Sequence, residues 1–400
     1  MSLDNTTSSV NSGVSISGYL TANDNGPAGL EILTRGAVIA AYLTANGNFY
    51  GALIQNDYIT NVQMPVTLTG VSTFIGNGNT GLQINSRGVI TLNNIAALNN
   101  GLAAVDGSGS GVDVDNTGGT LPKAVYVKGV NIFNGNDDTG LQIISFGLIS
   151  VSKITAEGNG KVGVYLYNGD SSVQSNVVLS GFGVFNDNGA IGGSGDGLEV
   201  LSRGSITLVN ITSQFNYGNG AELKTIGITT VHAVTLTGTN SFNYNGDFAG
   251  ESGLVVSADG NITVYNLTAS YNYEYGAYLD NYSYWAINTF STFGSVFVNG
   301  FGSFVGNTNG DGLYVKTHGN ITLNRVSSSG NGDDGFDLSA CVGSGCLGYV
   351  TITCSSAYGN TDTGVFINTP GIVTLKGFLA YGNTVDDEDI GGTIVRSTCP

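Results

Sequence analysis

The amino-acid sequence predicts an all-β fold in which the chain coils into a solenoid of stacked parallel rungs, a parallel β-helix. Asparagines recur along the chain at intervals of 23 to 36 residues, and glycine–leucine pairs recur at intervals of 52 to 59. The composition suits strands and turns, because 63 glycines accompany only 12 basic residues among 400. Repetition at such spacing is the signature of a stacked repeat, in which each repeat contacts its neighbours.

The recurring asparagines mark one turn of each rung and predict about fourteen rungs. Asparagine tolerates the left-handed backbone of tight turns, and its amide can bond its counterpart one rung away. We therefore assign these residues a structural role, as an asparagine ladder. The ladder consists of Asn25, Asn48, Asn77, Asn100, Asn136, Asn159, Asn188, Asn216, Asn245, Asn272, Asn307, Asn331, Asn360 and Asn383.

The glycine–leucine period shows that the repeat unit is a pair of rungs, copied about seven times. Within a rung, apolar and polar residues alternate, as at Leu313 and Val315 and again at Ile321 and Leu323, which is the pattern of a strand. Neighbouring parallel strands lie about 4.8 Å apart, so phenylalanines on adjacent rungs would crowd. The sequence places a small residue between them, in the column Phe74, Ala97, Phe133, Ala156, Phe185, Ser213, Phe242, Ala269, Phe304, Ser328.

The two ends differ from the repeat. We expect residues 1–12 to be a polar extension or cap, 13–385 to form the β-helix, and 386–400 to form a C-terminal cap or tail. All four cysteines lie in the last sixty residues, which favours two disulfides. Of the three possible pairings we favour Cys341–Cys346 within one loop and Cys354–Cys399 holding the tail.

Charge restricts the partners. Twelve basic and twenty-nine acidic residues give a net charge of −17, which disfavours nucleic acid and anionic membranes. No apolar run approaches the length of a membrane span, so we expect no membrane insertion. We expect no cofactor; calcium held by acidic turn residues is the one ion that the sequence leaves open, and no metal ligand is assigned.

The rungs resemble those of right-handed parallel β-helix proteins, the pectate-lyase-like superfamily. Their asparagine-rich repeats are similar to those of large secreted bacterial surface proteins of the adhesin type. The resemblance covers about residues 10–395 and implies a right-handed coil and an extracellular or cell-surface location. It carries little information about activity, since this fold hosts lyases, hydrolases, adhesins and phage tailspikes.

A search for catalytic groups finds fragments of the motifs of β-helix polygalacturonases: Asn360-Thr361-Asp362, Asp333-Asp334 and His318-Gly319. Inverting hydrolysis needs two carboxyl groups about 6.5–9.5 Å apart, and the repeat places Asp334 and Asp362 on adjacent rungs. The order along the chain is reversed, however, and the Arg-x-Lys motif is missing. Asp333, Asp334 and Asp362 are therefore the only catalytic candidates, and the sequence favours a protein without an active site.

Aromatic residues are the candidates for ligand binding. Outward strand positions hold Tyr165, Tyr278, Tyr314 and Phe366, and the insert at 280–295 adds Tyr282, Tyr284 and Trp285. Aromatic rings beside carboxylates and amides suit stacking on sugars; the alternative is that these rings pack on the solenoid itself.

We therefore expect a non-catalytic extracellular module, an adhesin, filament or matrix component that binds glycans or another surface protein. The alternative is a polysaccharide-degrading hydrolase or lyase. A minor alternative is an ice-binding solenoid, because threonines form an outward column, but Tyr126, Val178 and Phe297 interrupt it. An uncapped end of the β-helix would favour head-to-tail self-association.

Overall fold

A computed structural model describes the whole chain except residues 9, 59–61, 102–108, 190–194, 227–230, 248–249, 283–293, 342–345, 347 and 400. The described residues form strands and turns. None of them belongs to a helix that could cross a membrane. The chain divides into two compact units, Met1–Arg203 and Gly204–Pro400.

Each unit contains two parallel sheets, which we call sheet A and sheet B. Sheet A of the first unit consists of β1 (Ser2–Asp4), β4 (Ala28–Leu33), β7 (Tyr50–Gln55), β10 (Leu82–Asn85), β13 (Val112–Asp115), β16 (Leu141–Ile144), β18 (Val164–Tyr167) and β20 (Leu198–Ser202). Sheet B of the first unit consists of β2 (Val14–Ile16), β3 (Leu20–Thr21), β5 (Val38–Ala41), β6 (Leu43–Thr44), β8 (Val66–Thr69), β9 (Ser72–Ile75), β11 (Ile90–Asn93), β12 (Ile95–Leu98), β14 (Val125–Lys128), β15 (Asn131–Asn134), β17 (Ile149–Thr155) and β19 (Val177–Asn186).

The second unit repeats this arrangement. Its sheet A consists of β23 (Ala221–Thr225), β26 (Leu254–Ser257), β29 (Ala277–Asp280), β32 (Leu313–Thr317), β35 (Phe336–Ala340), β38 (Val365–Asn368) and β41 (Glu388–Ile390). Its sheet B consists of β21 (Ile206–Val209), β22 (Ile211–Gln214), β24 (Val234–Thr237), β25 (Asn240–Asn243), β27 (Ile262–Tyr265), β28 (Leu267–Thr268), β30 (Val296–Asn299), β31 (Gly302–Val305), β33 (Ile321–Asn324), β34 (Val326–Ser329), β36 (Val350–Thr353), β37 (Ser356–Tyr358), β39 (Ile372–Lys376), β40 (Leu379–Tyr381) and β42 (Thr393–Ser397).

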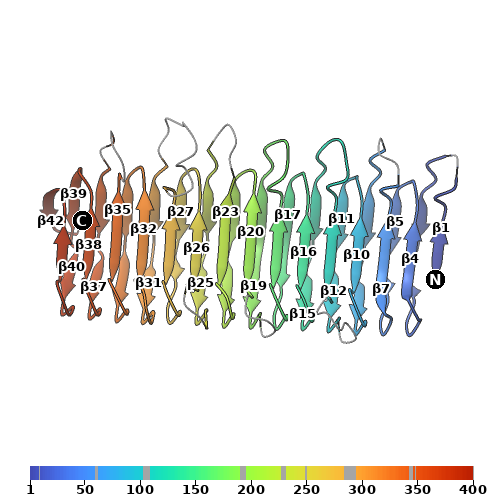
Figure 1. Cartoon of the computed structure of the whole chain (residues 1–400), viewed down its shortest axis with the longest axis horizontal. Helices are drawn as coiled ribbons and strands as arrows, with labels where there is room; N and C mark the ends of the chain where they lie inside the picture. Colours follow the sequence, from blue (N-terminus) through green and yellow to red (C-terminus); the bar gives the residue numbers. More distant parts are fainter. Residues whose placement is uncertain are drawn as a thin grey trace. The chain divides into compact units, whose positions relative to one another are not determined.

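Each strand pairs in parallel with the equivalent strand of the next rung, so like positions lie side by side. Leu313 is the Cα partner of Phe336, which in turn is the partner of Val365. The sheet A strands of the second unit accordingly run in one direction in Figure 1. This confirms the right-handed parallel β-helix, whereas the number of rungs and their grouping in pairs stay predictions.

The core fills the space between the sheets with columns of inward side chains. Phe74, Ala97 and Phe133 are successive Cα partners and are fully buried. In the second unit Phe304 is the partner of Ser328, and both are fully buried. The expected alternation of large and small residues is therefore confirmed within each unit. It lets each ring use the space above a small neighbour.

The asparagine ladder is buried and hydrogen-bonded. The backbone N–H and the side-chain Nδ2 of Asn77 both donate to Oδ1 of Asn100, at 3.1 and 2.8 Å. In the second unit Asn331 donates in the same way to Asn360, at 3.1 and 2.9 Å. The structural role is confirmed.

The expectation that these asparagines supply the left-handed backbone is wrong, because the residue before each one does so. Gly76 precedes Asn77 with φ of 64°, and Asn99 precedes Asn100 with φ of 52°. The ladder amide must face inward to bond two rungs, so the turn is made one residue earlier.

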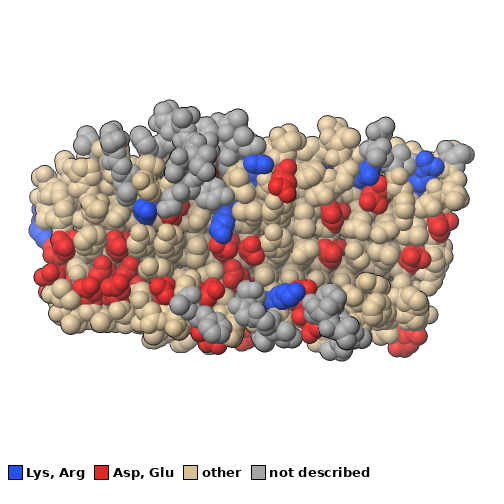
Figure 2. Space-filling view, viewed as in Figure 1, with Lys and Arg blue, Asp and Glu red and all other residues tan. Residues whose placement is uncertain are grey.

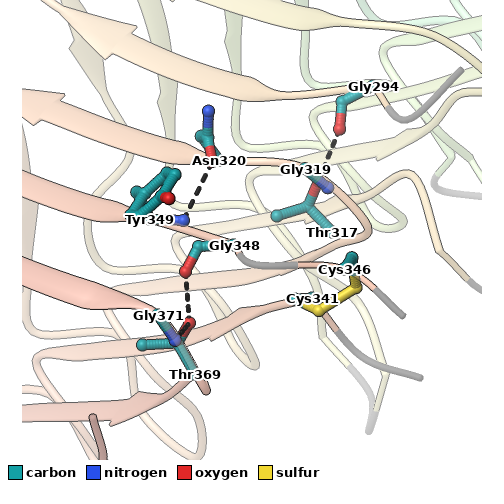
Figure 3. Close-up of a disulfide and its surroundings, with 10 residues drawn as sticks. All are labelled: Gly294, Thr317, Gly319, Asn320, Cys341, Cys346, Gly348, Tyr349, Thr369 and Gly371. Carbon is teal, nitrogen blue, oxygen red and sulfur yellow. Dashed lines mark hydrogen bonds between the residues drawn. A yellow bond between two sulfur atoms is a disulfide. The ribbon is translucent and has the colours of Figure 1, made fainter. Parts of the chain in front are cut away.

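A second buried polar column lies at the end of the sheet A strands, and the sequence analysis missed it. Thr317 and Thr369 each accept a hydrogen bond from the N–H two residues later, at Gly319 and Gly371 (Figure 3). Each hydroxyl also donates to a carbonyl of the preceding rung. Other rungs use an asparagine there: Asn56, Asn116, Asn168 and Asn281 each donate to such carbonyls.

The cysteines form two disulfides with the favoured pairing. Cys341 is bonded to Cys346, with Cα atoms 5.6 Å apart, and Cys354 to Cys399, with Cα atoms 5.3 Å apart. Figure 3 shows the first disulfide beside the second polar column. The second disulfide fastens the residues after β42 to the turn after β36, which restrains the tail.

Candidate functional site

Four neighbouring strands of sheet A in the second unit carry the candidate site on their outer face. Tyr278 on β29, Tyr314 on β32, Asp337 on β35 and Phe366 on β38 are successive Cα partners. Alternate residues of a strand point to opposite faces, so these four form one outward row while their neighbours fill the core. The structure thus brings together three of the aromatic candidates, and we call this row the aromatic–acidic row.

The rings at one end of this row pack on each other. The ring centroids of Tyr278 and Tyr314 are 4.9 Å apart with planes 4° apart, and Tyr275 lies 5.6 Å from each. Asp337 lies on the strand between those of Tyr314 and Phe366, so these two aromatic residues are two strand spacings apart, about 9.6 Å. The row therefore has a carboxylate between two aromatic side chains.

Carboxyl groups crowd the turns just before the row. Asp311 is buried, and its Oδ1 accepts a hydrogen bond from the backbone N–H of Asp334 at 2.9 Å. Asp334 accepts in the same way from Thr363 at 2.8 Å. Acidic residues are concentrated over these strands of the second unit in Figure 2.

Burial makes several of these carboxyl groups weak acids. Desolvation raises the pKa of Asp311 to about 8, with a further increase from the charge of Asp337. Desolvation and the charge of Asp334 raise the pKa of Asp337 to about 7. The pKa of Asp334 rises to about 6, again mainly through desolvation. These groups hold protons at pH values where an exposed aspartate has lost its own.

The three catalytic candidates lie together beside this row. Asp333, Asp334 and Asp362 each place one carboxylate oxygen within 4.8 Å of the other two. This approach is closer than the about 6.5–9.5 Å between carboxyl groups that admits the water of an inverting glycosidase. Oxygen ligands of this kind also suit calcium, but Asp333 is exposed and Asp334 and Asp362 are only half-buried.

Other aromatic candidates have different surroundings. The centroids of the Tyr282 and His318 rings are 4.6 Å apart. Lys316 Nζ also lies 4.6 Å from the Tyr282 centroid. The Tyr282 ring therefore packs against two residues of its own chain, His318 and Lys316. Tyr284 and Trp285 lie outside the described residues.

Tyr165 belongs to the first unit and does not take part in the row. It lies on β18 between its Cα partners Gln142 and Glu199, and its ring packs on that of Tyr167 at 6.1 Å. Desolvation raises the pKa of Tyr165, and the nearby charge of Glu199 raises it further.

The sequence analysis did not select Tyr275 and Asp311, although their positions in the repeat were readable. Each precedes the glycine that opens a sheet A strand, as Asp334 does, so the three residues form one column. Alignment of the repeats on that glycine would have found them.

The outward threonine column also exists, and a large residue interrupts it as expected. In the second unit Thr263 is the Cα partner of Phe297, which is the partner of Thr322. The phenyl ring breaks the flat array that an ice-binding surface needs.

Comparison with known proteins leaves the family open. No protein-family model matches this chain, and no curated protein matches it either. The fold and the geometry of the aromatic–acidic row therefore carry the functional argument.

Proposed function

We propose that this chain is a non-catalytic, extracellular β-helix module that binds a neutral polysaccharide through the aromatic–acidic row. The observation that carries the proposal is the register of Tyr278, Tyr314, Asp337 and Phe366 on adjacent strands. Aromatic side chains offer apolar surface to the C–H faces of sugar rings, and a carboxyl group between them can bond sugar hydroxyls.

The ordered sheet also favours binding by a preformed surface. The row stands on paired strands of one sheet, with buried neighbours such as Leu338 and Ile367 beneath it. Side chains held on strands lose little conformational freedom when a ligand binds, which favours affinity. The acidic turns beside the row favour uncharged sugars over acidic ones at this face, since like charges repel.

Retention on insoluble neutral polysaccharides, such as cellulose and β-1,3-glucan, tests this proposal. We expect the wild type to be retained and Tyr314→Ala and Phe366→Ala to lose most of that retention. Tyr358→Ala is the matched control, because Tyr358 is an exposed tyrosine of sheet B that stacks on Tyr381. If the wild type and the three variants were all retained equally, or if none of them were retained, the row would be excluded as the binding site.

A polysaccharide hydrolase is the second candidate, and the raised pKa values favour it. A general acid must hold a proton at the working pH, and the raised pKa values of Asp311, about 8, and Asp337, about 7, allow this near neutrality, whereas Asp334, with a pKa of about 6, is mostly ionised at pH 7. Release of reducing sugar in the same assay, abolished by Asp334→Asn, would replace the binding module with an enzyme. Retention without release supports the first proposal.

A further inference from the structure

A cavity of about 440 Å³ lies on the outer face of sheet B in the second unit. It is formed by β30, β33 and β36 and by the Cys354–Cys399 disulfide. Its volume falls within the range of small-molecule sites, about 300–1,000 Å³. We call it the Arg325 pocket, after the cation in its lining.

Amides and hydroxyls cover the strands of this pocket. Asn324 and Thr353 are Cα partners, and Asn299 follows Val298, the partner of Leu323. Thr322 adds a second hydroxyl. Among the described residues, none of these side chains forms a hydrogen bond with the protein, so their donors and acceptors are available to a ligand.

Arg325 supplies the charge of the pocket. The second unit contains five Lys and Arg residues: Lys224, Lys316, Arg325, Lys376 and Arg396. Lys224 pairs with Glu222, Arg396 pairs with Glu388, and Lys316 lies over the Tyr282 ring.

Of the two remaining cations, Arg325 lines this pocket and Lys376 lies on the strand next to it. Arg325 follows Asn324, and Lys376 is the Cα partner of Thr353. Within the described part of the unit, neither one has a carboxylate partner. Two uncommitted cations on one face of a protein with net charge −17 create a local site for an anion.

The backbone at Arg325 is strained. Its φ is 59°, in the left-handed region, whereas Gly300 and Gly377 occupy the same turn of other rungs with φ of 85° and 60°. A long side chain at such a position costs free energy that glycine would avoid. Cys354 has φ of 47° in the same turn of the next rung, so the left-handed backbone is a property of the repeat.

We propose that the Arg325 pocket binds the anionic group of an acidic sugar, a carboxylate or a sulfate ester. The guanidinium presents two parallel N–H donors, which match the oxygens of either group. The amides of Asn299 and Asn324 and the hydroxyls of Thr322 and Thr353 then bond the sugar hydroxyls. This site is on a different sheet from the aromatic–acidic row and does not depend on it.

Titration of the protein with glucuronic acid, glucose 6-sulfate or glucose, monitored by ligand-observed NMR, tests the proposal. We expect the wild type to bind at least one of the two anionic sugars saturably and to bind glucose at least about tenfold more weakly. Preference between the two identifies the anion. Arg325→Ala should weaken the binding by about tenfold or more, and Arg325→Lys should retain part of it.

Two further variants separate binding from folding. Arg325→Gly removes the side chain and suits the left-handed backbone, so we expect it to lose binding while its unfolding temperature does not fall. Lys153→Ala is the matched control, because Lys153 is an exposed cation in a left-handed turn, with φ of 46°, in the first unit. Binding of neither anionic sugar, or binding that Arg325→Ala leaves unchanged, would overturn the proposal. Tyr314→Ala should leave the binding of anionic sugars unchanged. Failure of the Arg325 proposal can therefore be distinguished from failure of the proposal for the aromatic–acidic row.

Discussion

Three aromatic residues of the second unit occupy left-handed turn positions that other rungs fill with glycine, asparagine or aspartate. Phe215, Tyr244 and Tyr271 have φ of 57°, 57° and 58°. A side chain in this conformation costs about 1–2 kcal/mol. The three rings stack with centroids 5.0 Å apart and planes 5° and 10° apart, and each aromatic pair contributes about 0.5–1.5 kcal/mol. The stacking energy therefore offsets much of the strain.

Substitution of the middle ring separates the two effects. Tyr244→Ala removes both stacking contacts but keeps the Cβ atom and its strain, so we expect it to lower the free energy of unfolding by about 1–2 kcal/mol. Tyr244→Gly removes the strain as well and should be close to neutral. Chemical denaturation of both variants measures the difference. Equal destabilisation by Ala and Gly would show that strain is not part of the balance.

At the scale of the strand, sheet A of the second unit combines a paired backbone with carboxyl groups that are poorly solvated. β32 and β35 place Asp311 and Asp334 at their entry turns and Asp337 on their outer face. Burial disfavours the charged form, and this is why all three pKa values are raised. The folded unit consequently retains protons that the unfolded chain, with aspartate pKa near about 3.9, has released.

This difference predicts how stability depends on pH. Between about pH 4 and pH 8 the folded state binds more protons than the unfolded state, so a rise in pH favours unfolding. We expect the unfolding temperature to fall from pH 5 to pH 8. Above pH 8 these groups should contribute little further change, because their highest pKa is about 8. Thermal unfolding followed by circular dichroism measures this trend.

Asp311→Asn keeps the shape of the side chain and removes its titration. We expect this variant to lose less stability between pH 5 and pH 8 than the wild type. Asp137→Asn, at an aspartate of the first unit, serves as the control for a general effect of charge removal. An identical pH dependence in Asp311→Asn and the wild type would contradict the assignment to Asp311.

The sequence predicted the features that depend on the repeat. Spacing alone located the asparagine ladder, the alternating phenylalanine column and the outward positions of Tyr278 and Tyr314, because parallel pairing copies sequence position into space. The left-handed position was readable from the glycine before many ladder asparagines, as at Gly76, but at Asn99 and Asn100 both residues are asparagines and only the direction of the amide separates them. The Arg325 pocket could not be predicted from the sequence, because whether a cation has a carboxylate partner depends on its neighbours in space and not on its position in the chain.

At the scale of the whole molecule, charge dominates behaviour in solution. Twelve basic and twenty-nine acidic residues give a net charge of −17 and an isoelectric point near 4.1. In the rung that contains β41 and β42, Glu388 and Arg396 lie at core-facing positions and pair with each other there.

Acid should therefore affect folding and solubility in opposite directions. As the pH falls toward 4.1 the net charge vanishes and repulsion between molecules is lost, so we expect self-association although the fold gains stability. Light scattering should rise between pH 5 and pH 4 while the circular dichroism spectrum stays that of the folded protein. Loss of the β spectrum before scattering rises would show that unfolding, and not loss of charge, causes association.

The amide-to-amide hydrogen bonds of the asparagine ladder point the same way within each unit, which gives the ladder an electric polarity. Asn307, Asn331 and Asn360 each donate from Nδ2 to the ladder asparagine on the C-terminal side, and Asn307 and Asn331 also donate to a carbonyl of the preceding rung. The carbonyl ends of these amides all face the N-terminal side, so the amide dipoles add along the stack as peptide dipoles add along an α-helix. In the second unit the donor end is Asn383, whose N–H and Nδ2 both donate to Oδ1 of Asp387, at 3.2 and 2.9 Å. A carboxylate at the positive end of aligned dipoles is stabilising, as it is at a helix N-terminus. Asp387 is thus the electrostatic counterpart of a helix cap.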